Sequence, residues 1–198
     1  GPFAVPTFES LIQSQHDVLG LVTRPDKLAR GRRKAPPNPM RESANLHQVE
    51  VHACQNINSD EGLAILDECQ ADLLVVCDYG QILSRVALGK ARCGGINLHG
   101  SLLPKYRGAA PIQWALLHGD KIAGISVIHM TPRLDGGPVL CQRSLEVLDH
   151  ENAAALEPRL SNLGVEAVHA AIAMLTDWDG QTVLGEPQNP DDVTKAPR

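Results

Sequence analysis

Short apolar segments alternate with helical patterns along this chain of 198 residues, and that alternation limits the possible folds more than any other feature. The runs at 18–23 and 72–77 are almost continuously apolar, which is typical of strands covered on both faces of a sheet. Helical spacing of apolar residues marks 3–15, 60–70 and 152–175. Strands and helices that alternate predict an α/β fold with an open, mostly parallel, Rossmann-like sheet and helices on both faces.

Further elements follow from local signals. Strands are predicted at 49–53, 96–98, 122–130 and 139–148, a short helix or turn at 81–88, and a helix at 112–118. Ser59 is expected to cap the helix over 60–70. The turn 133–138 is rich in glycine and proline, so the two strands around it are expected to pair antiparallel at one edge. Pro158 and Gly164 weaken the last helical pattern, which predicts a late start or a kink.

Composition sets the broad class. The length fits one domain with a core of its own, and no apolar run is long enough to cross a membrane. The five cysteines are odd in number and lack paired metal-ligand spacing, so we expect free thiols, a reducing compartment and no metal site. No nucleotide-binding or nucleophile-elbow motif is present, and no cysteine or serine stands out as an activated nucleophile.

The strand 96–98 ends in a polar pair. Side chains alternate along a strand, so Asn97 and His99 are expected to point to the same side while Leu98 points to the other. An amide donates a fixed hydrogen bond, and an imidazole donates or accepts near neutral pH. The pair therefore has catalytic potential, although in an arbitrary sequence it more often only satisfies backbone groups of a loop.

The most unusual composition lies between Arg24 and Arg41. This segment holds seven basic residues, four prolines and one acidic residue, so it carries +6 while the whole chain carries −5. A basic extended loop on an acidic body suits polyphosphate or nucleic-acid binding, because phosphate contacts supply most sequence-independent affinity. A solvated surface loop is the alternative that composition alone leaves open.

Two long motifs resemble a known family. INLHGSLLPKYRGAAPIQWAL at 96–116 and MTPRLDGGPVL at 130–140 closely resemble the folate-dependent formyltransferases, and similarity extends along nearly the whole chain. PDKLARGRRK at 25–34 resembles the loop with which one branch of that family contacts the acceptor end of tRNA. The resemblance implies a formyltransferase fold and transfer of a formyl group from 10-formyltetrahydrofolate to the α-amino group of methionine on initiator tRNA. Arg30, Arg32, Arg33 and Lys34 would contact the tRNA.

The reaction class explains which residues matter. Formyl transfer to an amine passes through a tetrahedral carbon that bears an oxyanion, which needs a hydrogen-bond donor and a group that handles the amine proton. Asn97 and His99 supply those groups, and a carboxylate beside the imidazole favours its protonated form. Asp135, in the turn LDGGP, is the carboxylate that we predict, and all three positions match the catalytic residues of the family.

Other assignments rest on the resemblance. It implies that 101–104 (Ser101, Leu102, Leu103 and Pro104) form a wall of the folate site, with ordinary loop shaping as the alternative. It also implies that Tyr79, Ile82 and Leu83 line the folate pocket, and packing at the end of a strand is an equal alternative. The residues Asp149, His150 and Glu151 are read as a solvated loop, because consecutive side chains diverge.

The resemblance also predicts the domain organisation. Residues 1–180 would form the catalytic domain, with a first strand expected before Gly1 that this sequence lacks, and 181–198 would be a linker towards a C-terminal domain. A cytoplasmic monomer without membrane contact is expected. The alternatives are a formyltransferase that acts on an amino sugar-nucleotide, a hydrolase that releases formate, and a non-catalytic RNA-binding module.

Overall fold

The computed structural model describes residues 1–25 and 38–198, so the predicted tRNA contacts Arg30, Arg32, Arg33 and Lys34 lie outside the described residues. Within those ranges the strands form a two-stranded sheet, β1-β2, and a four-stranded sheet, β3-β4-β5-β6. The strands are β1 (Leu21–Thr23), β2 (Val51–Ala53), β3 (Leu74–Val76), β4 (Gly95–His99), β5 (Ile122–His129) and β6 (Val139–Glu146).

The expected open α/β sheet is confirmed, and its pairing is mixed. β1 pairs with β2 and β3 with β4 in parallel, whereas β4 with β5 and β5 with β6 are antiparallel. The antiparallel edge pair was expected from the turn between β5 and β6. β1 and β3 are shorter than the apolar runs that predicted them, and each is hydrogen-bonded to a neighbouring strand on one side only.

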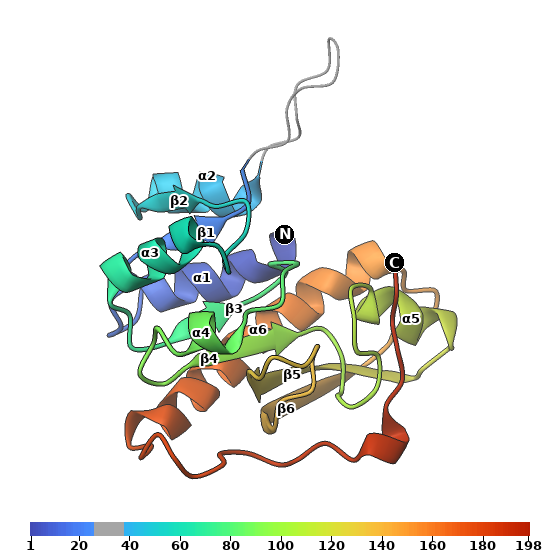
Figure 1. The fold of residues 1–198 in the computed structure, drawn as a ribbon. Coiled ribbons are helices and arrows are strands. Elements are labelled where there is room, and N and C mark those ends of the chain that lie inside the picture. Colours follow the sequence, from blue (N-terminus) through green and yellow to red (C-terminus); the bar gives the residue numbers. More distant parts are fainter. Residues whose placement is uncertain (26–37) are drawn as a thin grey trace.

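Helices cover both faces of the sheets (Figure 1). The helical elements are η1 (Pro2–Ala4), α1 (Val5–Ile12), α2 (Pro39–Leu46), α3 (Asp60–Cys69), α4 (Arg85–Leu88), α5 (Pro111–Leu117), α6 (Ala153–Thr176) and η2 (Pro190–Asp192). α1 and α6 pack together, and α6 lies against β5 and β6. α3 and α4 share a separate apolar cluster with the β3 end of the sheet.

Local signals account for where several helices begin. The Ser59 side chain accepts a hydrogen bond from the Gly62 amide, which confirms the predicted cap of α3. Asn152 caps α6 in the same way, and α6 begins at Ala153 and runs through Pro158. Of the two outcomes expected there, the late start is wrong, and the kink stays a prediction. Leu156 and Leu160 on either side of Pro158 are fully buried, and that packing outweighs the loss of one backbone hydrogen bond.

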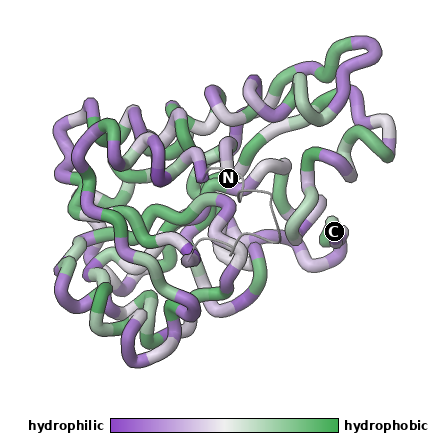
Figure 2. The backbone as a smooth tube through the Cα atoms, turned by 90° about the horizontal axis from the view of Figure 1, so that it is seen from above, coloured by the Kyte–Doolittle hydropathy of each residue, from purple (hydrophilic) through white to green (hydrophobic). Residues whose placement is uncertain are grey.

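The main core lies between the four-stranded sheet and α6. Ile96 and Leu98 of β4 are buried there with Leu160 and Val168 of α6. Figure 2 shows hydrophobic stretches through the interior of the chain trace and hydrophilic residues at the outer bends. Because side chains alternate along β4, burial of Ile96 and Leu98 on the α6 side directs Asn97 to the opposite face.

A cavity of about 930 Å³ lies between the two sheets. Residues of β1, β3 and α1 line it, and the edges of β1 and β3 that face each other across it are not hydrogen-bonded to each other. Gly1 lies beside Asp78, just beyond the carboxyl end of β3. The first strand that the resemblance expects before Gly1 stays a prediction.

The segment after α6 returns along the body of the protein. Figure 1 shows it passing below β6, through η2, and then rising beside α5 to the C-terminus. Glu186 pairs with Val139 at the start of β6, and Ala196 is fully buried. We call residues 186–197 the C-terminal strap. The predicted division at residue 180, and a further domain beyond this segment, stay predictions.

Candidate active site

Asn97 and His99 stand on β4, which is held on both sides by β3 and β5. His99 is the last residue of the strand and is buried, with only 6% of its surface exposed. The loop over 100–110 begins directly after it and leads into α5. The strand therefore gives the amide and the imidazole a rigid base at the edge where the chain changes to irregular structure.

The structure brings Asp135 to this pair, as the sequence predicted. The Asp135 Oδ2 atom lies 3.8 Å from His99 Nδ1, and Asn97 Nδ2 donates to Asp135 Oδ1 over 3.4 Å. The side chains of His99 and Asp135 are 7% and 10% exposed. Charges this far from water are screened less than charges at the surface.

The hydrogen bonds of His99 assign a task to each ring nitrogen. Nε2 lies 2.9 Å from the carbonyl oxygen of Tyr106. A carbonyl only accepts, so Nε2 carries a hydrogen and donates it. Nδ1 is left to face the Asp135 carboxylate at 3.8 Å, a separation too long for a direct hydrogen bond. The proton chemistry of this imidazole therefore falls to Nδ1.

The loop that follows β4 contributes backbone groups that were not predicted from the sequence. The Gly108 amide donates to Asp135 Oδ2 over 2.8 Å, and the Tyr106 carbonyl accepts from His99. Gly108 has a φ of +127°, and a Cβ there would lie 2.7 Å from the Ala196 oxygen of the strap. Only glycine combines that dihedral with so close an approach. These contacts are made by backbone atoms, which every residue type has. Apart from the glycine at position 108, the sequence therefore offered no indication of them.

Tyr106 is anchored by polar partners beneath the loop. Its hydroxyl donates to Asp120 Oδ2 over 2.9 Å and lies 3.1 Å from His118 Nδ1. Burial, together with the hydrogen bond to Asp120, raises the pKa of Tyr106 to about 12. These contacts show that Tyr106 holds the loop against the residues beneath it.

The residues predicted as a folate wall follow directly in the loop. Ser101 is buried, and its hydroxyl donates to the Lys105 carbonyl over 2.6 Å. Leu103 is also buried, and its amide donates to Ser126 Oγ. These contacts shape the loop. Leu102 and Pro104 are partly exposed, and contact of any of the four with folate stays a prediction.

The second predicted group lies after β3. Leu83 is buried in the cluster with Leu66 and Leu88, while Ile82 is 50% exposed. Tyr79 is partly buried, and burial raises its pKa to about 12. Packing accounts for Leu83, whereas Ile82 is open to solvent, and a role in binding folate stays a prediction for all three.

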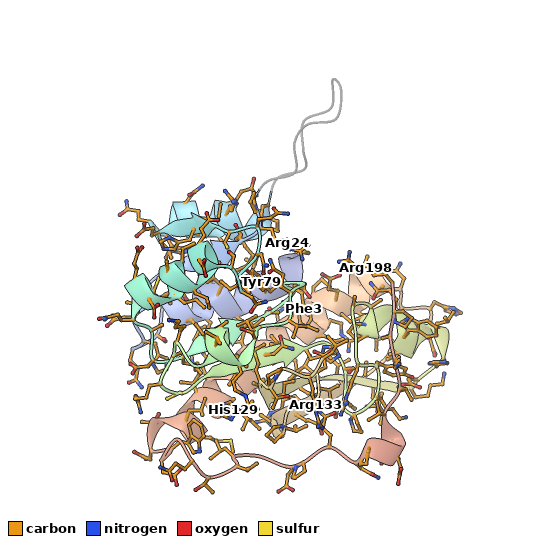
Figure 3. The ribbon with its side chains drawn as sticks, in the orientation of Figure 1. Phe3, Arg24, Tyr79, His129, Arg133 and Arg198 are labelled. Atoms are coloured by element: carbon orange, nitrogen blue, oxygen red, sulfur yellow. The ribbon has the colours of Figure 1, made fainter. Side chains whose placement is uncertain are left out.

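The described ends of the basic segment lie at this same edge. Arg24, just after β1, donates to the Gly80 carbonyl after β3, and Figure 3 shows Arg24 and Tyr79 close together. Arg41 donates to Thr23 Oγ1 and to the Arg24 carbonyl. The two ends of the basic segment are thus fixed at the carboxyl ends of β1 and β3, which is where α/β sheets bind ligands.

Metal-binding clusters and membrane-spanning helices are both absent from the part of the chain that the structure describes. In residues 1–25 and 38–198, no group of three or more His, Cys, Asp or Glu side chains is arranged to hold a metal ion. Over the same residues, no helix combines the length and the apolar character needed to cross a membrane.

Comparison with known proteins identifies the family. Residues 1–172 match the formyl transferase family. The chain is 53% identical to a methionyl-tRNA formyltransferase of Rhodopirellula baltica and 35% identical to one of Alkaliphilus oremlandii. These alignments cover 100% and 98% of this chain but only 61% and 62% of those relatives, so the chain spans about three fifths of their length.

A solved structure supports the fold. The phosphoribosylglycinamide formyltransferase of Bacillus halodurans superposes with a TM-score of 0.73 over 88% of this chain and 92% of that one, at 21% identity. The fold, the family match over most of the chain and the meeting of an amide, an imidazole and a carboxylate at the end of β4 agree with one another. The chain belongs to the formyl transferase family.

Proposed function

We propose that this chain carries the catalytic site of an enzyme that transfers a formyl group from 10-formyltetrahydrofolate to the α-amino group of methionine on initiator tRNA. The observation that carries the proposal is the convergence of Asn97, which is partly buried, with the nearly buried side chains of His99 and Asp135. The names of the two curated relatives support the choice of amine, because both are methionyl-tRNA formyltransferases.

The chemistry divides among the three side chains. The amine nitrogen attacks the formyl carbon, the carbonyl oxygen becomes an oxyanion, and collapse breaks the bond from that carbon to the folate nitrogen. Asn97 Nδ2 donates to the oxyanion. His99 Nδ1, the ring nitrogen that Tyr106 leaves open, handles the proton that the amine loses and the folate nitrogen gains.

Asp135 keeps the imidazole ready for that task. Its Oδ2 atom accepts from the Gly108 amide and faces His99 Nδ1, so its charge lies where a protonated imidazole is stabilised. The side chains of His99 and Asp135 are almost inaccessible to solvent. A charge that is already in position there needs little reorganisation of its surroundings during the reaction. The mechanism uses no metal and no covalent intermediate.

The basic segment supplies the polynucleotide contact. Arg30, Arg32, Arg33 and Lys34 would bind phosphates of the tRNA acceptor end. The position of Arg24 and Arg41 supports this, because they fix both ends of the segment to the carboxyl edge of the sheet. Folate contacts by the 101–104 wall and by Tyr79, Ile82 and Leu83 belong to the same proposal, as do a monomeric state and a cytoplasmic location. The five free cysteines suit that reducing compartment.

The decisive experiment compares acceptors. The protein is given 10-formyltetrahydrofolate with charged initiator tRNA, with an amino sugar-nucleotide, or with no acceptor, and formylated product and free formate are both measured. We expect product on the tRNA only. Product on the sugar-nucleotide, or formate release without acceptor, would assign one of the alternative activities instead. RNA binding with no turnover would indicate a non-catalytic module.

A second experiment tests the site itself. His99→Ala is expected to lower turnover roughly 10²–10³-fold, the usual scale for loss of such a group. The matched control is His150→Ala, because His150 is exposed in a surface loop. Turnover of His99→Ala near that of the control would reject the proposed role.

A third experiment tests the basic segment. Replacing Arg32, Arg33 and Lys34 by glutamine should weaken tRNA binding and lower the slope of log K against log salt by about one for each phosphate that is no longer neutralised. The control replaces the exposed residues Arg85, Lys121 and Arg143 in the same way. Equal slopes for the two triple variants would contradict the assignment.

A further inference from the structure

The Asp135 backbone is held by a side chain far away in the sequence. Asp135 has a φ of +46°, a left-handed conformation that costs a non-glycine residue about 1 kcal/mol or more. Gln188 of the C-terminal strap donates its Nε2 hydrogens to the Asp135 carbonyl over 2.8 Å and to the Gly137 carbonyl over 2.7 Å. One amide thus satisfies two carbonyls of the turn and stabilises its strained shape.

The oxygen of the Gln188 side-chain amide contacts the loop that follows β4. Gln188 Oε1 accepts from Arg107 Nε over 3.1 Å and from Arg107 Nη2 over 2.7 Å. Arg107 directly follows Tyr106, whose carbonyl holds His99, and precedes Gly108, whose amide holds Asp135. Gln188 therefore links the turn that carries the carboxylate to the loop that orients both His99 and that carboxylate.

The backbone of the strap reinforces the link. The Arg107 amide donates to the Thr194 carbonyl over 2.9 Å, and the Ala196 amide donates to the Arg107 carbonyl over 2.7 Å. The Tyr106 amide donates to Thr194 Oγ1 over 2.8 Å. Figures 1 and 3 show the end of the chain, Arg198, beside α5 directly after the strap. The strap, which the sequence predicted only as part of a linker, is thus hydrogen-bonded to the loop of the candidate site.

We infer that Gln188 is a positioning residue that holds Asp135 in register with His99 by clamping the 133–138 turn to Arg107. The inference rests on the proposed function for its effect on turnover, but the clamp itself does not. The hydrogen bonds of Gln188 go to Arg107 and to the carbonyls of the turn, so its influence passes through the Asp135 backbone and through Arg107. Misplacement of a reacting group by about 1 Å can cost on the order of 10²-fold in rate.

Two substitutions separate the halves of the clamp. Gln188→Glu keeps an acceptor for Arg107 but sets a carboxylate against the carbonyls of Asp135 and Gly137. Gln188→Met keeps the size and removes both halves. Gln181→Glu is the matched control, because Gln181 is exposed just before the strap and receives the same charge change. All variants are made in the full chain, and kcat is calculated from the concentration of folded protein.

Each Gln188 variant should lower kcat about 10- to 100-fold while KM for the folate and for the acceptor changes less than about threefold. Asp135→Asn with Gln188→Glu should be no worse than Asp135→Asn alone, since a residue that acts through Asp135 adds nothing once the carboxylate is gone. If either Gln188 variant keeps kcat within about twofold of the parent, or if the two reductions multiply, the inference is overturned.

Amide exchange tests the clamp without any reaction. The Gly108 amide donates to Asp135 Oδ2, so release of the turn should speed its hydrogen exchange by about tenfold or more in Gln188→Glu and leave it unchanged in Gln181→Glu. Unchanged exchange in Gln188→Glu would overturn the inference even in an active enzyme. Absence of formyl transfer in the parent chain, with faster Gly108 exchange in the variant, would instead refute the proposed function and leave the clamp supported.

Discussion

Asp135→Asn removes the charge of the carboxylate and keeps the shape of the side chain. An asparagine oxygen can still accept from the Gly108 amide, so the turn keeps its main side-chain contact. What disappears is the attraction between the carboxylate and a protonated imidazole 3.8 Å away, together with the long hydrogen bond of 3.4 Å that Asn97 donates to the other carboxylate oxygen. With an effective dielectric constant of about 20, two unit charges at that distance attract by about 4 kcal/mol. Both side chains are nearly buried, so solvent reduces this attraction only in part.

That attraction converts to a rate. If the transition state contains the protonated His99, removal of about 4 kcal/mol corresponds to roughly 10³-fold in turnover, and partial screening lowers the expected effect to about 10²–10³-fold. The assay is the initial rate of formyl transfer at saturating folate and acceptor. Asp149→Asn, in an exposed loop, is the control. A decrease of less than about tenfold for Asp135→Asn would refute the view that this charge serves the imidazole.

Three further predictions concern activity and stability. Asn97→Ala should lower turnover roughly 10²–10³-fold with little change in melting temperature, whereas Asn162→Ala on the exposed side of α6 should change neither. Gly137→Ala should cost about 3 kcal/mol of unfolding free energy by denaturant titration, since its Cβ would collide with the His129 carbonyl oxygen. Hydrogen bonds from Arg159, then from the Leu148 amide, lower the pKa of Glu151, so its stabilisation exists above the ordinary glutamate pKa and is lost as pH falls through the lower folded value. Glu151→Gln should therefore lower the melting temperature at about pH 7 and not at strongly acid pH, and an equal difference at both would contradict this sign.

Much of the fold could be predicted because its signals are local. Ser59 marks the start of α3 through a hydrogen bond that spans three residues, and the alternation along β4 separates Asn97 from Leu98 by pleat geometry alone. Asp135 could be predicted as the partner of His99 from a motif resemblance and from the rule that loops at one sheet edge converge. None of these inferences needed a contact between distant segments to be known in advance.

Other features were set by contacts between segments far apart in the sequence. The helix α6 starts before Pro158 because buried leucines on either side outweigh one missing hydrogen bond, and local propensity argued the opposite. The ring nitrogen of His99 that faces Asp135 is set by the other nitrogen, which donates to the Tyr106 carbonyl. Because every residue type has a backbone carbonyl, the sequence did not indicate this contact. Gln188 lies 53 residues from Asp135, and no periodicity or motif joins the two.

The sequence by itself identified Asn97, His99 and Asp135 as candidate catalytic residues through a family resemblance, and the two-residue repeat of a strand placed Asn97 and His99 on one side of β4. Folding determined their working geometry: a 3.8 Å separation of imidazole and carboxylate, a left-handed Asp135, and a strap that links the turn to the loop. The physical reason is that hydrogen bonds and steric contacts between distant segments depend on where the packed core places each backbone, which local sequence does not encode.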